Sequence, residues 1–256
     1  MDQSLDVTEL ERKVKETYKD VAESPEEEYH FEMGRPLAER LGYSPADLDN
    51  IPGAAIDSFA GVGYHYDLAD LKEGEHVLDL GSGSGMDVFV AALHVGESGS
   101  VTGLDMTDEQ LEKARALRDE AGMTTVSFEK GKIEDLPFED ETFDVVVSNG
   151  VINLSPEKDS VFAEANRVLK PDGRIALSDI ISEEQMPESI KNDADLWASC
   201  IGGAEQVDDY QSLMERAGFE MDEMRANPEY EFISDQAASA CQRYGVKSIS
   251  AVAHKQ

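Results

Sequence analysis

The segment from His76 to His94 constrains the fold of this 256-residue chain more than any other. Val77–Leu80 is a short apolar run that predicts a buried strand, and residues 81–85 are a run of glycine and serine. Asp87–His94 is apolar enough to be a helix packed on a sheet. A buried strand that turns directly into such a helix is the first half of a βαβ unit.

The same alternation continues along the chain. Strands separated by helices of this length predict a mostly parallel sheet with right-handed crossovers. The further strands are expected at Val101–Asp105, Thr125–Glu129, Phe143–Val147, Arg174–Asp179 and Lys247–His254, the last at an edge of the sheet, and the further helices at Asp108–Glu120, Lys158–Leu169 and Asp209–Ala217.

Two regions do not follow this alternation of strands and helices. Residues 1–66 are polar and mainly helical: Thr8 and Glu11 have the spacing of a capping box, and residues 51–66 look irregular. Residues 182–205 form a polar insertion after the fifth strand. We therefore expect a helical lid segment at 1–66, a core at 67–181, and an acceptor-side insertion with the completion of the sheet at 182–256.

The charge balance excludes several partners. The chain has 55 Asp and Glu residues against 22 Lys and Arg, a formal net charge of −33. Without a basic cluster, neither nucleic acid nor an anionic membrane is an expected partner. Such a charge repels itself unless salt screens it, so we expect a halophilic protein, with an acidic mesophilic one as the alternative. The amino terminus has no apolar leader, which predicts a cytoplasmic protein.

The glycine-rich turn is the first chemical signal. Gly81, Ser82 and Gly83 allow a ligand to approach the backbone, and the following helix start offers free amide groups. Asp79 ends the strand, and a carboxylate there suits a ligand with an ammonium group better than a phosphate. A plain strand-to-helix turn is the alternative interpretation.

Further acidic residues narrow the ligand. Asp105 ends the second strand, where a carboxylate accepts hydrogen bonds from ribose hydroxyls. Glu134 follows the third strand and can accept from an adenine amino group, with Ile133 and Met106 on either side of the ring. Each acid alone is equally compatible with a helix cap or a solvated loop. Together with Asp79 they predict a nucleoside with a cationic amino-acid tail.

These motifs, in this order, resemble those of class I S-adenosylmethionine (SAM)-dependent methyltransferases. Residues 77–85, 131–137, 143–146 and 167–174 and Asp105 carry the resemblance. It implies a Rossmann-like α/β fold with a seven-stranded, mostly parallel sheet and helices on both faces. It also implies SAM as the cofactor and no metal. By resemblance, the cofactor-binding residues are Asp79, Gly81, Ser82, Gly83, Asp105, Met106, Ile133, Glu134 and Asn149.

A narrower resemblance is to arsenite methyltransferases, carried by residues 103–107, 148–158 and 196–204. This chain departs from that group at two thiol positions, because Gly150 and Val62 stand where those enzymes carry cysteine. Only Cys200 falls on a thiol position of the group. Trivalent arsenic is a soft centre that prefers several thiolates, and one cysteine cannot form that site alone.

The acceptor is therefore open. Candidate catalytic residues are Cys200, Asn149 and His65, and Cys200 is equally well a buried small hydrophobe. A small-molecule acceptor is the leading hypothesis, with the protein a monomer or homodimer. Two alternatives are arsenite methylation using Cys200, Cys241 and external thiols, and SAM binding without catalysis.

Overall fold

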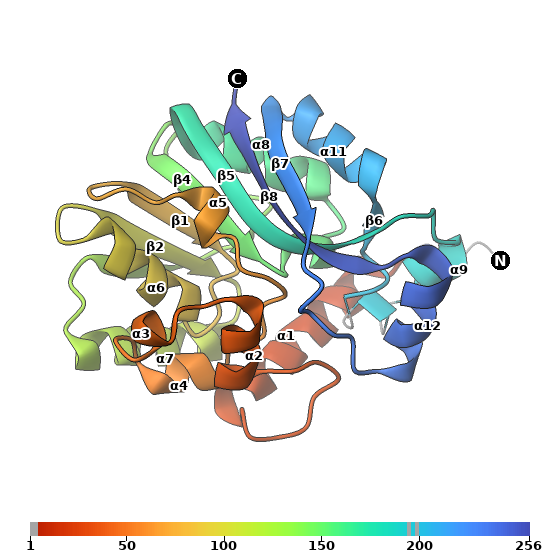
Figure 1. Ribbon diagram of the computed structural model, residues 1–256, viewed down its shortest axis with the longest axis horizontal. Helices are drawn as coiled ribbons and strands as arrows, with labels where there is room; N and C mark the ends of the chain where they lie inside the picture. Colours follow the sequence, from red (N-terminus) through yellow and green to blue (C-terminus); the bar gives the residue numbers. More distant parts are fainter. Residues whose placement is uncertain (1–4, 194–195, 198–199) are drawn as a thin grey trace.

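The computed structural model describes residues 5–193, 196–197 and 200–256 (Figure 1). Its strands form one sheet in the order β3-β2-β1-β4-β5-β8-β7, and the short β6 pairs with β5. β8 runs antiparallel to β5 and β7, and the other pairs are parallel. The strands are β1 (His76–Leu80), β2 (Ser100–Asp105), β3 (Val126–Lys130), β4 (Phe143–Asn149), β5 (Leu169–Ser182), β6 (Glu205–Gln206), β7 (Phe219–Ala226) and β8 (Lys247–Lys255).

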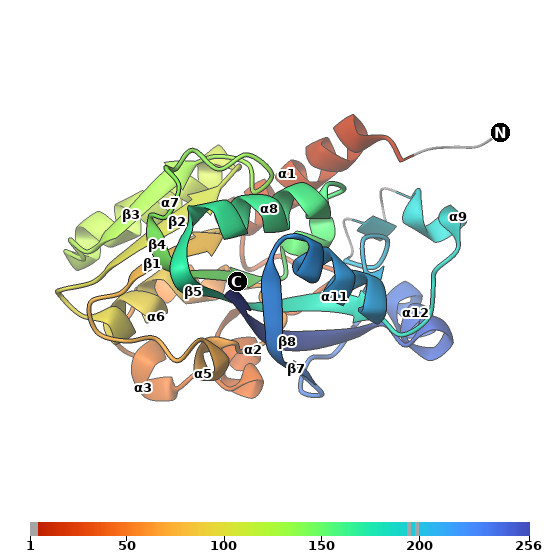
Figure 2. The ribbon, with the colours of Figure 1, turned by 90° about the horizontal axis from the view of Figure 1, so that it is seen from above.

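Helices cover both faces of this sheet. In the view along the sheet, α8 and α11 lie on one face, and α5 and α6 lie on the other (Figure 2). The described helices are α1 (Val7–Glu23), α2 (Gly34–Leu41), α3 (Pro45–Leu48), α4 (Gly53–Asp57), α5 (Tyr66–Ala69), α6 (Met86–Val95), α7 (Asp108–Ala121), α8 (Lys158–Val168), α9 (Glu188–Lys191), α11 (Val207–Arg216) and α12 (Asp235–Tyr244), with the 3₁₀ turn η1 at Ile152–Leu154.

The central strands are apolar on both sides because each side meets helices. Val77 of β1 packs with the α6 side of the sheet, whereas Leu78 and Leu80 pack with the α8 and α11 side. All three side chains are fully buried. A parallel strand buried on two faces reads as a continuous apolar run, as in Val77–Leu80. The polar residues that remain are concentrated where the strands end.

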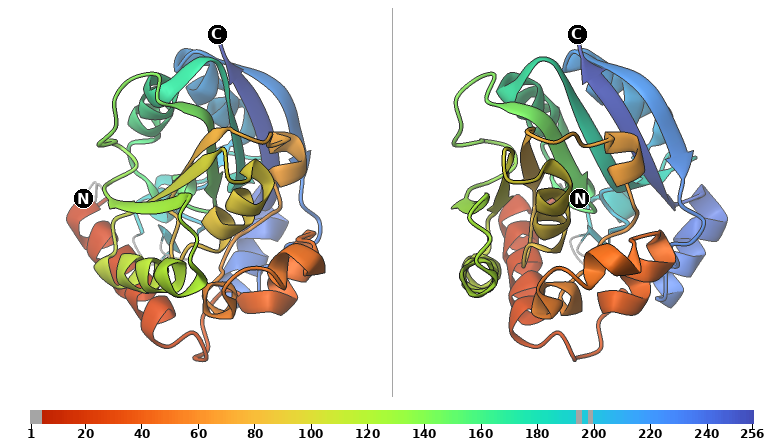
Figure 3. Two further views of the ribbon diagram at one scale, coloured as in Figure 1. Left: turned by 90° about the vertical axis from the view of Figure 1, so that its left-hand side faces the viewer. Right: turned by 60° about the vertical axis from the view of Figure 1, so that its left-hand side comes forward.

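The amino-terminal helix crosses the carboxyl edge of the sheet. α1 lies beside α7, as both views of Figure 3 show. Gln110 Nε2 donates to the carbonyl of Tyr18 over 2.7 Å, and Lys113 Nζ donates to the carbonyl of Ala22 over 3.0 Å. These bonds hold α1 over the ends of β1 and β2, where the glycine turn lies.

The predicted fold class is confirmed: helices flank a mostly parallel sheet, and β6 adds a two-residue strand to the seven expected. Three local predictions were wrong. The capping box at Thr8 is not used, because Asp6 is the N-cap and accepts from the amide of Glu9. Residues 51–66 are not wholly irregular, since they contain α4. Lys247–His254 is a strand, but it is not at the edge.

β7 is the edge strand that the sequence analysis missed. It pairs antiparallel with β8, with a bulge between Met221 and Glu223. The two flanking strands leave β8 almost fully buried. No helix in the described ranges combines the length and apolarity that a membrane crossing requires.

Candidate functional site

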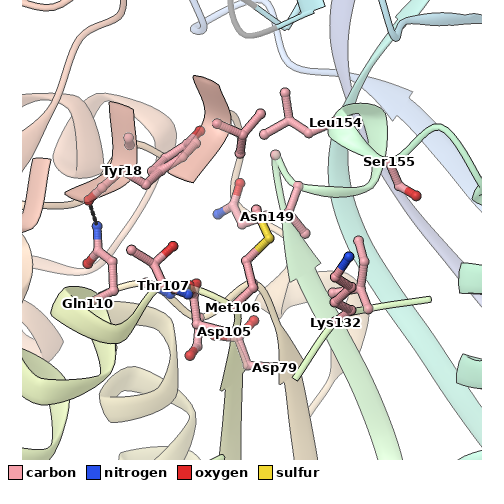
Figure 4. A pocket seen from close by; sticks show the side chains of 18 of the residues that line it. Tyr18, Asp79, Asp105, Met106, Thr107, Gln110, Lys132, Asn149, Leu154 and Ser155 are labelled. Carbon is pink, nitrogen blue, oxygen red and sulfur yellow. Dashed lines mark hydrogen bonds between the residues drawn. The ribbon is translucent and has the colours of Figure 1, made fainter. Parts of the chain in front are cut away.

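A cavity of about 210 Å³ lies at the carboxyl ends of β1, β2 and β4, beneath α1 (Figure 4). Tyr18 of α1 and Gln110 of α7 close one side. Every residue predicted to bind the cofactor lines this cavity: Asp79, Gly81, Ser82, Gly83, Asp105, Met106, Ile133, Glu134 and Asn149. The structure therefore brings together residues that are more than 60 positions apart in the sequence.

The glycine turn has a backbone that other residues would strain. Gly81 has a φ of +72° and Gly85 a φ of +93°. A Cβ atom on Gly81 would lie 2.6 Å from Val151 Cγ2, and one on Gly85 would lie 2.7 Å from Phe128 Cζ. Both the left-handed conformation and the close packing require glycine. The turn can therefore present its backbone directly to the cavity.

Asp105 ties the glycine turn to the end of β2. Its Oδ2 accepts from the amide of Gly83 over 2.9 Å, and its Oδ1 accepts from the amide of Thr107 over 2.8 Å. Burial raises the pKa of Asp105, and these amide hydrogen bonds oppose that rise. The carboxylate is thus fixed in orientation and keeps acceptor capacity for a further donor.

Asp79 and Ser82 carry buried polar atoms that have no hydrogen-bond partner among the described residues. Asp79 Oδ2 and Ser82 Oγ receive no hydrogen bond from the described part of the chain. Burial raises the pKa of Asp79 well above its usual range, and the charges of Asp87 and Asp105 add to the rise. An unpartnered buried carboxyl oxygen is costly, so it points to a ligand that supplies a donor. A cationic donor fits best beside three carboxyl groups.

Asp87 is a site residue that the sequence analysis did not identify. The hydroxyl of Tyr43 donates to Asp87 Oδ1 over 2.5 Å, and Asn149 Nδ2 donates to Asp87 Oδ2 over 3.1 Å. Burial raises the pKa of Asp87 to about 6, although these hydrogen bonds act to lower it. The sequence did offer one indication of this role, because Asp87 is the single acidic residue in the otherwise apolar segment Met86–Val95.

Asn149 joins the amino-terminal segment to β4. Its Oδ1 accepts from the amide of Val62 over 2.8 Å, and its Nδ2 also lies 3.1 Å from the carbonyl of Gly63. Together with the bond to Asp87, these contacts occupy the acceptor and donors of the side-chain amide. The arrangement favours a positioning role for Asn149 over a role in chemistry.

His65, a candidate catalytic residue, does not line the cavity. The side chain is fully buried, and its Nδ1 lies 3.4 Å from Ser178 Oγ. Burial lowers the pKa of His65 to about 3, so the ring is neutral. Asp179 is also outside the cavity lining and accepts a 2.8 Å hydrogen bond from the hydroxyl of Tyr210. Neither group is placed to act on a molecule in the cavity.

Cys200 lines a separate pocket of about 10 Å³ that shares Tyr18 and Ala60 with the main cavity. Val62 also lines this small pocket, and a Cβ on Gly150 would lie 3.1 Å from Val62 Cγ1. The three positions matching family thiols thus converge, but only one carries sulfur. Burial raises the pKa of the Cys200 thiol to about 12, so the thiol is protonated.

The remaining predicted residues lie outside the pockets, at the edge of the cavity or outside the described ranges. Cys241 is half-buried and lines neither pocket. Glu134 Oε1 accepts from Ser155 Oγ, which orients its carboxylate near Ile133. Ala198 and Ser199, within the segment 196–204 that resembles arsenite methyltransferases, lie outside the described residues. In the described part of the chain, no three His, Cys, Asp or Glu side chains are grouped to hold a metal ion.

A family model described as a methyltransferase domain matches residues 71–218. The chain belongs to the methyltransferase family. This match spans the methyltransferase core from before β1 to the end of α11, including the glycine turn and Asp105. The resemblance drawn from the sequence motifs is confirmed.

Named relatives of this methyltransferase include several arsenite methyltransferases. One from Halobacterium salinarum is 43% identical over 199 residues, which are 77% of this chain and 51% of the relative. One from Aquipseudomonas alcaligenes is 49% identical over 156 residues, which are 58% of this chain and 45% of the relative. The chain thus spans about half the length of the curated relatives it matches.

A solved structure shows the same fold. The arsenic(III) S-adenosylmethionine methyltransferase of Chlamydomonas reinhardtii superposes with a TM-score of 0.64 at 32% identity. The match covers 86% of this methyltransferase and 73% of the solved chain.

Proposed function

We propose that this chain binds SAM in the cavity under α1 and transfers its methyl group to a small-molecule acceptor. The observation that carries the proposal is the buried Asp79 Oδ2, which lies beside the glycine turn and Asp105 and has no hydrogen-bond partner in the described ranges. Family membership and the names of the relatives support it.

The residues present fit the parts of SAM. Asp79 would take the ammonium of the amino-acid tail, and the fixed carboxylate of Asp105 would accept from the ribose hydroxyls. Met106 and Ile133 would flank the adenine ring, with Glu134 near its amino group. When bound, this cofactor supplies a methyl group activated by a sulfonium.

The chain's own contribution is orientation and the exclusion of water. Leu10, Val14 and Tyr18 of α1 line the cavity from above. The ion pair of 2.6 Å between Lys132 and Glu11 closes the helix onto the loop after β3. We propose that residues 1–66 act as the lid and that residues 182–256 complete the acceptor side.

The acceptor proposed first is a small molecule that does not need three thiolates. Val62 and Gly150 replace two of the family thiols, and the remaining thiol of Cys200 is protonated. Arsenite methylation with Cys200 and external thiols is the second candidate, which the names of the relatives at 43% and 49% identity favour.

One experiment separates these functions. The protein is incubated with methyl-labelled SAM and either arsenite plus glutathione or a small-molecule cell extract, and the labelled products are identified by mass spectrometry. Labelled arsenic that disappears with Cys200→Ala but persists with Cys241→Ala supports arsenite methylation. Labelled organic products that survive Cys200→Ala support the first proposal. SAM binding with no labelled product in either mixture contradicts both and indicates a binding protein without catalysis.

The acidic composition supports a proposal about habitat. A formal net charge of −33 favours unfolding through self-repulsion at low ionic strength, and molar salt screens charges beyond a few ångströms. We propose that the protein works in a cytoplasm of high salt concentration.

A further inference from the structure

Three carboxyl groups share the wall of the cavity: those of Asp79 and Asp87, which are buried, and that of Asp105, which is half-buried. Among the described residues that line the cavity, Lys132 is the single cation. Its ammonium pairs with Glu11 at the rim. No lining cation within the described chain is therefore available to neutralise the three acids, and their mutual repulsion must be relieved in another way.

The surroundings of two of the three acids favour the ionised carboxylate. Asp87 accepts from the hydroxyl of Tyr43 and from Asn149 Nδ2. Asp105 accepts from the backbone amides of Gly83 and Thr107. Hydrogen bonds donated to a carboxylate favour its charged form. These two groups are thus poor places for a proton.

Asp79 is the third acid and has the opposite surroundings. Its side chain is buried, and Oδ2 receives no hydrogen bond from the described part of the chain. The titratable groups that face it are Asp87 from α6, Asp105 from β2, and the phenols of Tyr43 and Tyr66. Both phenols stay neutral because burial raises their pKa values. Among the described residues, the charges that act on Asp79 are those of Asp87 and Asp105, and both are negative.

We infer that Asp79 carries a proton in the free protein and releases it to solvent when the ammonium group of the cofactor binds, with Asp87 as the positioning residue that enforces this exchange. The inference rests on the proposed function, because it takes SAM or its product as the ligand. The carboxylic acid loses one proton to the buffer, and a carboxylate–ammonium pair takes its place. The net charge of the cluster is therefore the same before and after binding, because the ammonium takes the place of the proton.

A consequence is that cofactor affinity depends on pH. While Asp79 is protonated in the free protein and ionised in the complex, binding releases a proton, and affinity rises with pH. For the release of one proton, the affinity can rise by at most about tenfold per pH unit. If Asp87 had only a structural role, its replacement would change the affinity for the cofactor but not the dependence of that affinity on pH.

The test is a calorimetric titration with S-adenosylhomocysteine in phosphate and in Tris at about pH 7, two buffers with very different enthalpies of ionisation. The difference in heat gives the number of protons released. We expect about one for the wild type, less than half of that for Asp87→Asn, and close to none for Asp79→Asn. Asp172→Asn, a surface change, is the matched control and keeps the wild-type number.

The outcomes are distinguishable. If S-adenosylhomocysteine binds the wild type without releasing a proton, the inference is overturned while the proposed function stands. The same holds if Asp87→Asn binds and releases as many protons as the wild type. Should Asp87→Asn not fold, the wild type and its pH series decide alone. A wild type that gives no saturable heat in either buffer overturns the proposed function itself.

Discussion

The backbone amide of Gly83 donates a 2.9 Å hydrogen bond to Oδ2 of Asp105. This bond joins the turn after β1 to the end of β2, so one carboxylate orders the backbone of the turn and faces the cavity. A change at Asp105 should therefore affect ligand binding through both its own contacts and the shape of the turn.

Asp105→Ala should weaken the binding of S-adenosylhomocysteine by about 1–3 kcal/mol, because hydrogen bonds to a charged group are lost. A calorimetric or fluorescence titration measures this as an increase in the dissociation constant of about five- to 150-fold. Asp108→Ala is the control, since Asp108 pairs with Lys130 outside the cavity lining. An unchanged dissociation constant for Asp105→Ala would remove Asp105 from the site.

Gly81→Ala should destabilise the fold and impair binding. The new Cβ would lie 2.6 Å from Val151 Cγ2, at a φ of +72°. Gly122 is a matched control, because it has a φ of +65° but nothing within 4 Å of its Cβ position. Urea unfolding should show a loss of about 1 kcal/mol for Gly122→Ala and about 1–3 kcal/mol more for Gly81→Ala. Equal losses would mean that packing at Gly81 is not tight.

Lys132→Ala should loosen the lid. The Lys132–Glu11 pair is partly exposed, so its loss is worth about 0.2–1 kcal/mol. We expect the rate constant for dissociation of S-adenosylhomocysteine to rise by up to about fivefold, as measured by stopped-flow fluorescence. Lys130→Ala removes a comparable surface pair with Asp108 and should leave that rate unchanged. Equal effects of the two variants would contradict a closing role for the pair.

The stability of the protein should depend on pH through Asp179. Burial raises the pKa of Asp179 from 3.8 to about 6 in the folded protein. The folded state thus binds this proton more tightly than the unfolded chain, and the resulting stability is lost as pH rises from about 4 to about 6.

Asp179→Asn keeps an acceptor for Tyr210 and removes this dependence. Relative to the wild type, its free energy of unfolding should improve by up to about 3 kcal/mol between those pH values. Urea titrations across that range measure the difference, with Asp172→Asn as a surface control. A difference that stays constant with pH would show that Asp179 is ionised in both states.

Salt should stabilise the protein if self-repulsion opposes its fold. The melting temperature should rise steadily from low salt to molar KCl, since screening weakens repulsion among the acidic side chains. A melting temperature that is no higher in molar KCl would refute the proposed high-salt habitat.

Local patterns predicted the part of the fold that is buried on two faces. The local sequence of Val77–Leu80 is enough to predict a strand, and the glycine-rich residues after it are enough to predict a turn. β7 was missed because an edge strand with a bulge alternates poorly, half of its side chains are polar, and all but Phe219 are partly or fully exposed. Lys247–Lys255 was found as a strand, but its position within the sheet depends on β7.

The site was predicted only as far as its residues lie next to strand ends. Asp79 and Asp105 follow from that rule. Tyr43 did not, because it reaches the site from a distant helical segment through tertiary packing. The position of Cys200 beside Val62 in a separate pocket likewise arises from tertiary packing, which no local pattern encodes.

The central claim is that the cavity under α1 binds the adenosyl cofactor. Isothermal titration of S-adenosylhomocysteine into the protein in molar KCl, at two temperatures, tests it most directly. We predict saturable binding of one molecule per chain, with a lower affinity for Asp79→Asn. The absence of saturable heat at both temperatures would contradict it.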